Sequence, residues 1–257
     1  MGILSGGREN AIFKRNDTVV RPLNSYSLSI HLLLQHFEKQ GIEGVPRFVA
    51  IDGDNEVVTF VEGKTVNYPL SGAAVSDIAV KSAGQLLRRL HDASVGFIAD
   101  ASYKDQQWML PVREPVEVMC HGDYAPYNMA LVGNEVVGIF DFDTAHPAPR
   151  LWDLAYAIYC WAPFKTHVYD KLGELPDQIY RAKLFCDAYG MTNSQRQQLV
   201  ATMIERLQAL VDFMKQQAAE GNTQFIANLA DGHHLSYLAD IDYLQQNGKQ
   251  IIAGLMG

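Results

Sequence analysis

The sequence has few cysteines, no long apolar run and no cluster of basic residues. Its three cysteines are too few and too scattered for a disulfide framework or a four-cysteine metal site: Cys120, Cys160 and Cys186. We therefore expect a reducing compartment, the cytoplasm. No apolar run approaches the roughly 20 residues that span a bilayer, so no membrane association is expected. Residues 1–12 also lack the charged start and apolar middle of a secretory signal.

The charge balance is acidic, with 21 Lys and Arg against 29 Asp and Glu and a net charge of −8. Binding to nucleic acid needs Lys and Arg clustered on one face, so no nucleic-acid partner is expected. With 257 residues, of which 48% are hydrophobic, the chain has enough apolar material for a folded domain of two lobes. The sequence specifies no particular oligomeric state.

The pattern of residues 1–63 predicts a small, β-rich N-terminal lobe. Residues 10–21 predict a hairpin, because two β-prone runs flank Asn16-Asp17, which suits a tight turn. A helix follows over 25–40 and ends before Gly41, and strands are expected at 47–51 and 56–61. One face of the predicted helix is apolar and carries Tyr26, Ile30, Leu33, Leu34 and Phe37.

The pattern of residues 64–257 predicts a larger and mostly helical C-terminal lobe. Together, the two lobes give an α+β fold class. Residues 118–143 form a loop and a short hairpin that turns at Gly133-Asn134. The helix expected at 194–219 has a capping-box pattern in Ser194 and Gln197. The remaining helices are expected at 76–91, 151–161, 177–189 and 224–246.

Two short motifs in this lobe carry groups suited to chemistry. The first is His121-Gly122-Asp123 with Asn128 five positions after the Asp, and the second is Asp141-Phe142-Asp143 at the end of an apolar stretch. Such side chains are common in turns, but turns do not explain the fixed spacing of all of them. An Asp, an Asn and a later Asp can hold a Mg²⁺ ion that is bound to a nucleotide. They can also orient a hydroxyl group toward the terminal phosphate of that nucleotide.

At these residues the chain resembles the aminoglycoside phosphotransferase and choline kinase family, which has a protein-kinase-like two-lobe fold. That family has H-G-D-x-x-x-x-N and then I-D-[FW]-[DE], and the resemblance extends over about residues 86–157. Leu90-His91 and Asp153-Leu154-Ala155 also fit its pattern. The resemblance implies a small-molecule kinase that transfers the γ-phosphate of ATP or GTP to a hydroxyl, with Mg²⁺ as cofactor. The acceptor stays open among antibiotics, amino alcohols and sugar-like metabolites.

The resemblance also implies roles for the motif residues. Asp123 would orient or deprotonate the acceptor hydroxyl, while Asn128 and Asp141 would ligate Mg²⁺. Asp143 would add a metal contact through water or cap the following turn. His121 would support the site by fixing the loop against Asp153 or nearby backbone.

Further residues are expected to support or line the site. Asp153 would support it or cap a helix that begins near Trp152. An acceptor pocket is expected at aromatic residues in and after the catalytic loop: Tyr124, Tyr127, Trp152 and Tyr156. Aromatic faces suit cationic amines, although aromatic residues at helical spacing also form core.

The nucleotide site is expected at the start of the chain. Ser5, Gly6 and Gly7 match the family's phosphate-covering loop, and Phe60 and Glu62 match the hinge whose backbone binds the base. Arg21 ends a strand where the family has a phosphate-binding Lys, and Arg binds phosphate bidentately. The family pairs that Lys with a helix Glu, whereas the helix here has Ser29, Ile30 or His31. Arg21 is therefore expected to lack its carboxylate partner.

Two other functions stay open on the sequence. The first is a nucleotide-binding pseudokinase or immunity-type binding protein, suggested by the missing Glu. The second is a metal-dependent phosphatase that would use His121, Asp123, Asp141 and His146, although such enzymes need two closely spaced metal ions.

Overall fold

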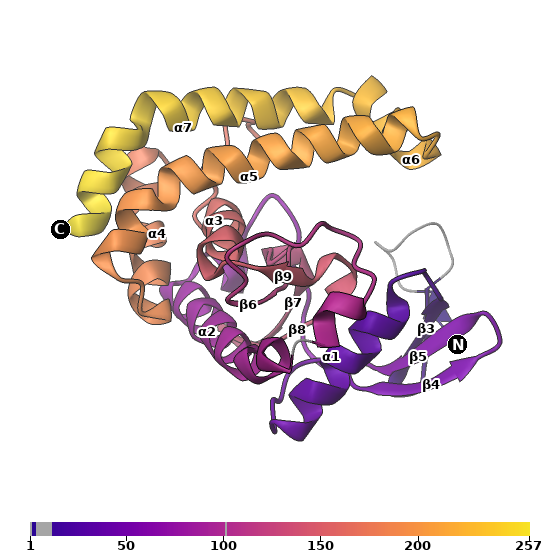
Figure 1. Ribbon diagram of the computed structural model, residues 1–257. Coiled ribbons are helices and arrows are strands. Elements are labelled where there is room, and N and C mark those ends of the chain that lie inside the picture. The colour runs from indigo at the N-terminus through magenta and orange to yellow at the C-terminus, as the bar shows by residue number, and fades with distance from the viewer. Residues whose placement is uncertain (1, 4–11, 101) are drawn as a thin grey trace. The chain divides into compact units, whose positions relative to one another are not determined.

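The structure is a computed structural model that describes residues 2–3, 12–100 and 102–257 (Figure 1). Its contacts divide the chain into two compact units. The first unit holds Met1–Thr65, Leu86–Asp123 and Asn128–Arg150, and the second holds Val66–Gln85, Tyr124–Tyr127 and Leu151–Gly257. The lobe boundary near residue 63 stays a prediction.

A five-stranded antiparallel sheet forms one part of the first unit. Its strand order is β1-β2-β3-β5-β4, and the strands are β1 (Gly2–Ile3), β2 (Phe13–Arg15), β3 (Thr18–Pro22), β4 (Phe48–Asp52) and β5 (Asn55–Thr59). The predicted hairpin between β2 and β3 is confirmed, and Asn16 in its turn has the left-handed φ of 56° that Asn tolerates. In this sheet Arg21 on β3 stands directly opposite Glu56 on β5.

Helix α1 (Ser27–Lys39) lies beside these strands (Figure 1). The predicted apolar face is confirmed, because all five of its residues are buried. The ring of His31 stacks on the ring of Phe48 of β4, with 4.1 Å between the ring centroids. The polar side chain of His31 is therefore held inside the first unit, next to the sheet.

The rest of the first unit contains two strand pairs and the 3-10 turns that connect them. β6 (Val118–Cys120) pairs with β9 (His146–Ala148), and β7 (Met129–Val132) pairs with β8 (Glu135–Ile139). Short 3-10 helices cover Ser102–Asp105 and Phe142–Thr144, and a further one, Pro126–Asn128, begins in the second unit. The β7–β8 pair confirms the predicted hairpin, with Gly133 at its turn in the left-handed region.

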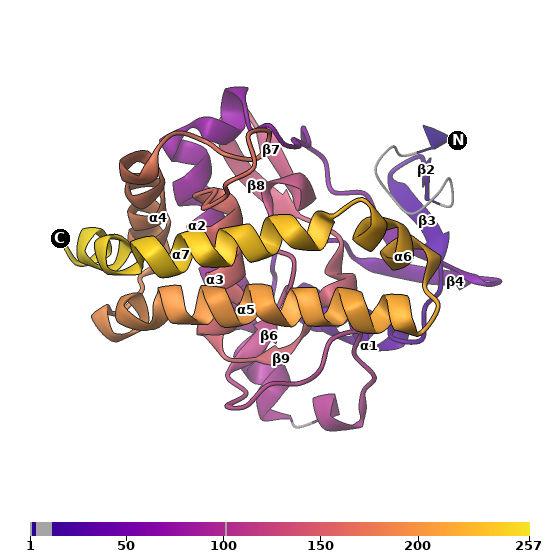
Figure 2. The same cartoon turned by 90° about the horizontal axis from the view of Figure 1, so that it is seen from above.

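Helix α2 (Asp77–Ala99) follows a 3-10 helix over Gly72–Val75 and continues eight residues beyond its expected end at 91. The second unit then holds α3 (Arg150–Trp161), α4 (Leu175–Tyr189), α5 (Asn193–Ala219), α6 (Thr223–Ala230) and α7 (His233–Met256). Figure 2 shows the long helices α5 and α7 running side by side. The α+β composition with an extensive helical part is confirmed.

Two local predictions in this unit are wrong. The single helix expected over 224–246 is two helices, because Gly232 adopts a φ of 78° that interrupts the helical hydrogen bonds. The capping box of α5 is formed by Thr192 and Gln195 rather than by Ser194 and Gln197. The Thr192 hydroxyl accepts from the Gln195 N–H, so the N-cap lies two residues earlier than expected and the helix begins at Asn193. Within the described part of the chain, no helix combines the length and the apolar character needed to cross a bilayer.

Candidate active site

The β7–β8 hairpin brings the two sequence motifs together. The residues Met129 and Ile139 are paired across the hairpin, and the N–H of Phe140 donates to the carbonyl of Asn128 at 3.0 Å. Asn128 therefore precedes one strand at the same end of the hairpin at which Asp141 follows the other. This register places the ends of the two motifs next to each other, within the first unit.

Asn128 is tied to Asp123 through its amide nitrogen. Its Nδ2 donates to the Asp123 carboxylate at 2.9 Å and to the Asp123 backbone carbonyl at 3.0 Å. Both acceptors are oxygens, so the amide nitrogen must face them and the amide oxygen is directed to the other side. Asn128 is 5% exposed. The pair thus fixes the Asp123 carboxylate and orients the Asn128 oxygen as an acceptor on the other side.

The loop before Asp123 is anchored to the turn after Phe140. The Nε2 of His121 lies 3.1 Å from the carbonyl oxygen of Phe140, and the Thr144 hydroxyl donates to the carbonyl of His121 at 2.9 Å. Gly122 has a φ of 81°, and a Cβ at this position would clash with the Thr144 carbonyl. The loop therefore requires Gly for its conformation and for its close approach to the turn.

The two acidic residues of the second motif differ in exposure. Asp141 adopts a left-handed φ of 64°, uncommon for a residue with a Cβ, and its side chain is 50% exposed. The side chain of Asp143 is only 12% exposed, and the Tyr26 hydroxyl donates to it at 3.3 Å. The strained Asp141 backbone directs one carboxylate outward, while Tyr26 of the segment before α1 helps hold the other.

Arg21 connects these carboxylates to the sheet. Its Nη2 lies 2.8 Å from Asp143 Oδ1, its Nη1 lies 3.4 Å from Asp141 Oδ1, and its Nε lies 2.6 Å from Glu56 Oε1. Burial of the guanidinium opposes its charge, but the carboxylates of Asp143, Glu56 and Asp141 raise the pKa of Arg21 above its ordinary value. Arg21 is therefore a permanent cation among three acidic groups.

The expectation that Arg21 lacks a carboxylate partner is wrong. Glu56 supplies the carboxylate from the neighbouring strand, and its other oxygen contacts Nε2 of His31 on α1. The side chain of Glu56 is fully buried. A sequence signal was present, because Glu56 stands at the start of the strand expected at 56–61, directly before Val57-Val58. The strand register needed to use that signal came only from the structure.

The other residues expected to bind nucleotide lie partly outside the described residues. Ser5, Gly6 and Gly7 fall in the segment 4–11, which is not described. Phe60 lies under the ammonium of Lys14, 3.4 Å from its ring centroid, and Lys14 also pairs with Glu62 at 3.2 Å. Phe60 and Glu62 thus share one cation just beyond the end of β5.

The predicted acceptor aromatics belong to the second unit. Tyr124 is completely buried and its hydroxyl donates to the carbonyl of Ala83 at 2.7 Å, so it is part of the core rather than an open lining. Tyr127 is partly exposed and meets the ring of Tyr68 edge-on. The rings of Trp152 and Tyr156 are nearly buried. Their faces are occupied by a cation of the chain itself, the guanidinium of Arg206, at 5.6 and 4.6 Å from the centroids.

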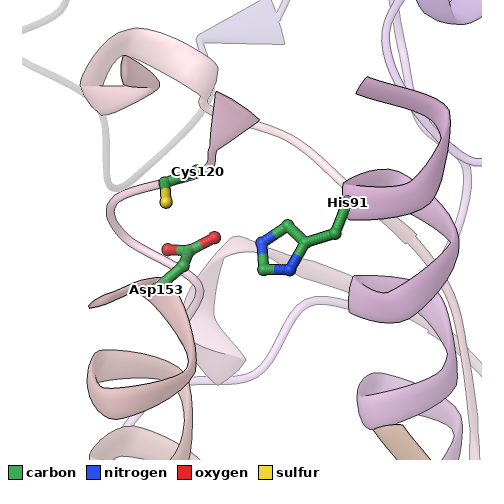
Figure 3. Close-up of side chains that lie close together, drawn as sticks. All are labelled: His91, Cys120 and Asp153. Atoms are coloured by element: carbon green, nitrogen blue, oxygen red, sulfur yellow. The ribbon is translucent and has the colours of Figure 1, made fainter. Parts of the chain in front are cut away.

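Figure 3 shows three buried side chains, His91 of α2, Cys120 of β6 and Asp153 of α3. His91 and Cys120 belong to the first unit, where a ring nitrogen of the His lies within 4.8 Å of the Cys sulfur. Asp153 belongs to the second unit. The expectation that it caps a helix beginning near Trp152 is wrong, because α3 begins at Arg150 and Asp153 lies inside its first turn. In the first turn, its negative charge interacts favourably with the positive, N-terminal end of the helix dipole.

Comparison with known proteins agrees with this geometry. Residues 99–190 match the Phosphotransferase enzyme family, and they contain both motifs. The predicted family resemblance is confirmed. Over 212 residues the chain is 28% identical to the trifolitoxin immunity protein of Rhizobium leguminosarum bv. trifolii, covering 78% of each chain.

Two solved structures show the fold. A choline/ethanolamine kinase family protein from Mesorhizobium loti aligns with a TM-score of 0.59 and 16% identity, over 96% of this chain and 89% of that one. An ethanolamine kinase from Plasmodium vivax aligns with a TM-score of 0.61 and 12% identity, over 87% and 75% of the two chains. The protein-kinase-like fold predicted from the sequence is confirmed.

Proposed function

We propose that this protein transfers the γ-phosphate of ATP or GTP to a hydroxyl group of a small molecule. The observation that carries the proposal is the hydrogen bond from Asn128 to the Asp123 carboxylate, at the end of the hairpin where Asp141 follows. Phosphoryl transfer depends mainly on positioning and on charge neutralisation. Positioning would come from the carboxylate of Asp123, which the amide of Asn128 holds in place. Charge neutralisation would involve the carboxylates of Asp141 and Asp143 and the buried cation Arg21.

The donor set fits a magnesium ion. Asn128, Asp141 and Asp143 would hold it, because carboxylate and amide oxygens are hard donors. The two carboxylates already converge on a single cation, the guanidinium of Arg21. When bound, Mg²⁺ neutralises the charge of the nucleotide phosphates.

The chain's own residues would divide the remaining tasks. Asp123 would accept a hydrogen bond from the acceptor hydroxyl and receive its proton. Arg21 would bind phosphate oxygens through its terminal nitrogens. We retain Ser5, Gly6 and Gly7 as the phosphate-covering loop, Phe60 and Glu62 at the base, and Tyr127 on the acceptor side.

A nucleotide-binding immunity protein without turnover is the second candidate. It is supported by the similarity to the trifolitoxin immunity protein. The sequence argument for it was the missing carboxylate partner of Arg21, and Glu56 supplies that partner. The phosphatase alternative gains no support, since His146 is buried with its Nδ1 2.8 Å from the Thr144 carbonyl.

The decisive experiment measures ADP or GDP release from Mg·ATP or Mg·GTP across a panel of hydroxyl compounds. The panel would contain aminoglycosides, amino alcohols and sugars. We expect one class to stimulate release, and Asp123→Ala to lower that rate by about 10²- to 10⁴-fold, with Asp141→Ala also strongly impaired. The matched control is Asp105→Ala, which removes an exposed carboxylate away from both motifs.

Thermal shift separates the two candidates. A kinase should be stabilised by Mg·nucleotide and should also turn over, whereas a binding protein would be stabilised without turnover. Full activity in both Asp123→Ala and Asp141→Ala would refute the proposed site.

A further inference from the structure

We propose that Glu56, together with His31, is the positioning element that holds Arg21 ready for the nucleotide phosphates. This inference rests on the proposed function, because it assigns a task within the same nucleotide site. It concerns two residues that neither motif contains and that lie outside the segment matched by the phosphotransferase family, residues 99–190.

The arrangement starts from the strand register. Arg21 and Glu56 are direct partners in the antiparallel β3–β5 pair, and directly opposed residues project from the same face of a sheet. The short separation of Nε and Oε1, 2.6 Å, follows from this register. Both members of the ion pair therefore stand on adjacent strands of one sheet.

The contacts of Arg21 divide its guanidinium into two edges. Nε faces Glu56 on the sheet, whereas the terminal nitrogens Nη1 and Nη2 face Asp141 and Asp143 on the turn after β8. A guanidinium is planar and rigid, so fixing its Nε edge also fixes the direction of the terminal nitrogens. These nitrogens form the fork that binds phosphate bidentately. Glu56 therefore aims the phosphate-binding edge at the carboxylates that would hold the metal.

His31 completes the arrangement from the other side. Its Nε2 contacts the second oxygen of Glu56, and its ring is stacked on Phe48. The buried carboxylate is thus held between a cation on one strand and an imidazole on α1. A carboxylate buried without such partners would be strongly unfavourable, and the pair of contacts leaves it one orientation, directed at Arg21.

The test compares Glu56→Gln with the wild type and with Asp52→Asn. Gln keeps the size of the side chain and removes its charge. Asp52→Asn is the matched control, because it removes a carboxylate that pairs with Arg15 at the exposed end of the same sheet. We expect Glu56→Gln to raise the nucleotide KM about tenfold, as loss of one charge-assisted contact would, without changing the acceptor KM. An unchanged nucleotide KM, or an equal effect of Asp52→Asn, would overturn the proposal.

A second measurement needs neither turnover nor a variant that folds. Hydrogen exchange at the Nε–H of arginine side chains, followed by NMR in the wild-type protein, should be much slower for Arg21 than for the exposed Arg15. Exchange as fast as that of Arg15 would show that Glu56 does not hold the guanidinium. If the wild type neither binds nor turns over nucleotide, the proposed function fails, whereas fast exchange at Arg21 would refute the positioning role of Glu56 whether or not nucleotide binds.

Discussion

Arg21 and Asp143 form an ion pair of 2.8 Å that joins β3 of the sheet to the turn following the β7–β8 hairpin. The side chains are 14% and 12% exposed, so the pair is largely removed from water. Asp141 and Glu56 contribute further negative charge around the same guanidinium. One buried cation, Arg21, therefore holds these three carboxylates together.

Replacing Arg21 with Met should destabilise the protein strongly. The change leaves the buried carboxylates of Glu56 and Asp143 without their cation, and removing one partner of a buried pair costs about 3–5 kcal/mol. Urea unfolding followed by circular dichroism measures the loss. The control is Arg15→Met, which removes an exposed ion pair with Asp52 and should cost about 0–1 kcal/mol. Equal losses in the two variants would contradict the role assigned to Arg21.

Substitution of Gly122 by Ala tests the packing of the loop that carries Asp123. A left-handed φ costs a residue with a Cβ about 1–2 kcal/mol, and at Gly122 the Cβ would also clash with the Thr144 carbonyl. Gly133→Ala is a matched control, because Gly133 has a φ of 59° and open space around its Cβ position. We expect the urea midpoint to fall further for Gly122→Ala, and activity to fall only in that variant. Indistinguishable midpoints would show that the contact with Thr144 is loose.

The ionised carboxylate of Asp187 should stabilise the folded protein at neutral pH but not in strong acid. Partial burial opposes its charge, but hydrogen bonds from Lys183 and Arg196 lower its pKa below the ordinary 3.8. A depressed pKa stabilises the folded state above the unfolded pKa, and this stabilisation is lost as the pH falls through the folded pKa. Because the side chain is 47% exposed, screening limits the effect to about 0–1 kcal/mol.

The check for Asp187 is the difference in unfolding free energy between wild type and Asp187→Asn. The difference should be present at pH 7 and should decrease as the pH falls below 3.8 and through the lower pKa of the folded state. Asp231→Asn, which changes an exposed carboxylate between α6 and α7, serves as the comparison. A difference for Asp187→Asn that is the same at pH 7 and in acid would contradict the prediction.

The three cysteine thiols should be unreactive in the folded protein. Cys120, Cys160 and Cys186 are all buried, and burial raises the pKa of Cys186 to about 12. The thiolate is the reactive species, so Ellman's reagent at pH 8 should detect no thiol within minutes. After unfolding in urea it should detect all three. Rapid reaction of one native thiol would show that its helix or strand opens readily.

The sequence anticipated the elements whose signals are local. The apolar face of α1 and the turn at Gly133 were readable because side-chain periodicity and turn residues act over a few positions. The capping box of α5 was misread, because Ser194 and Gln197 show the same pattern as Thr192 and Gln195 two positions earlier. The break at Gly232 was missed, because a single Gly is tolerated inside a helical pattern. Tyr124 was misplaced for another reason: an aromatic residue in a catalytic loop gives no local sign of whether it faces a site or the core.

By itself, the sequence determined the chemistry that is available. Asp123, Asn128 and Asp141 stand at fixed spacings, and their spacing identifies the hairpin that brings them together. Only the tertiary structure decided how Arg21 is held, because its partner Glu56 is set by strand register. Register arises from packing across the whole sheet, since a shift of one residue would turn every side chain to the opposite face. The same dependence on long-range packing placed Arg206 over Trp152 and Tyr156.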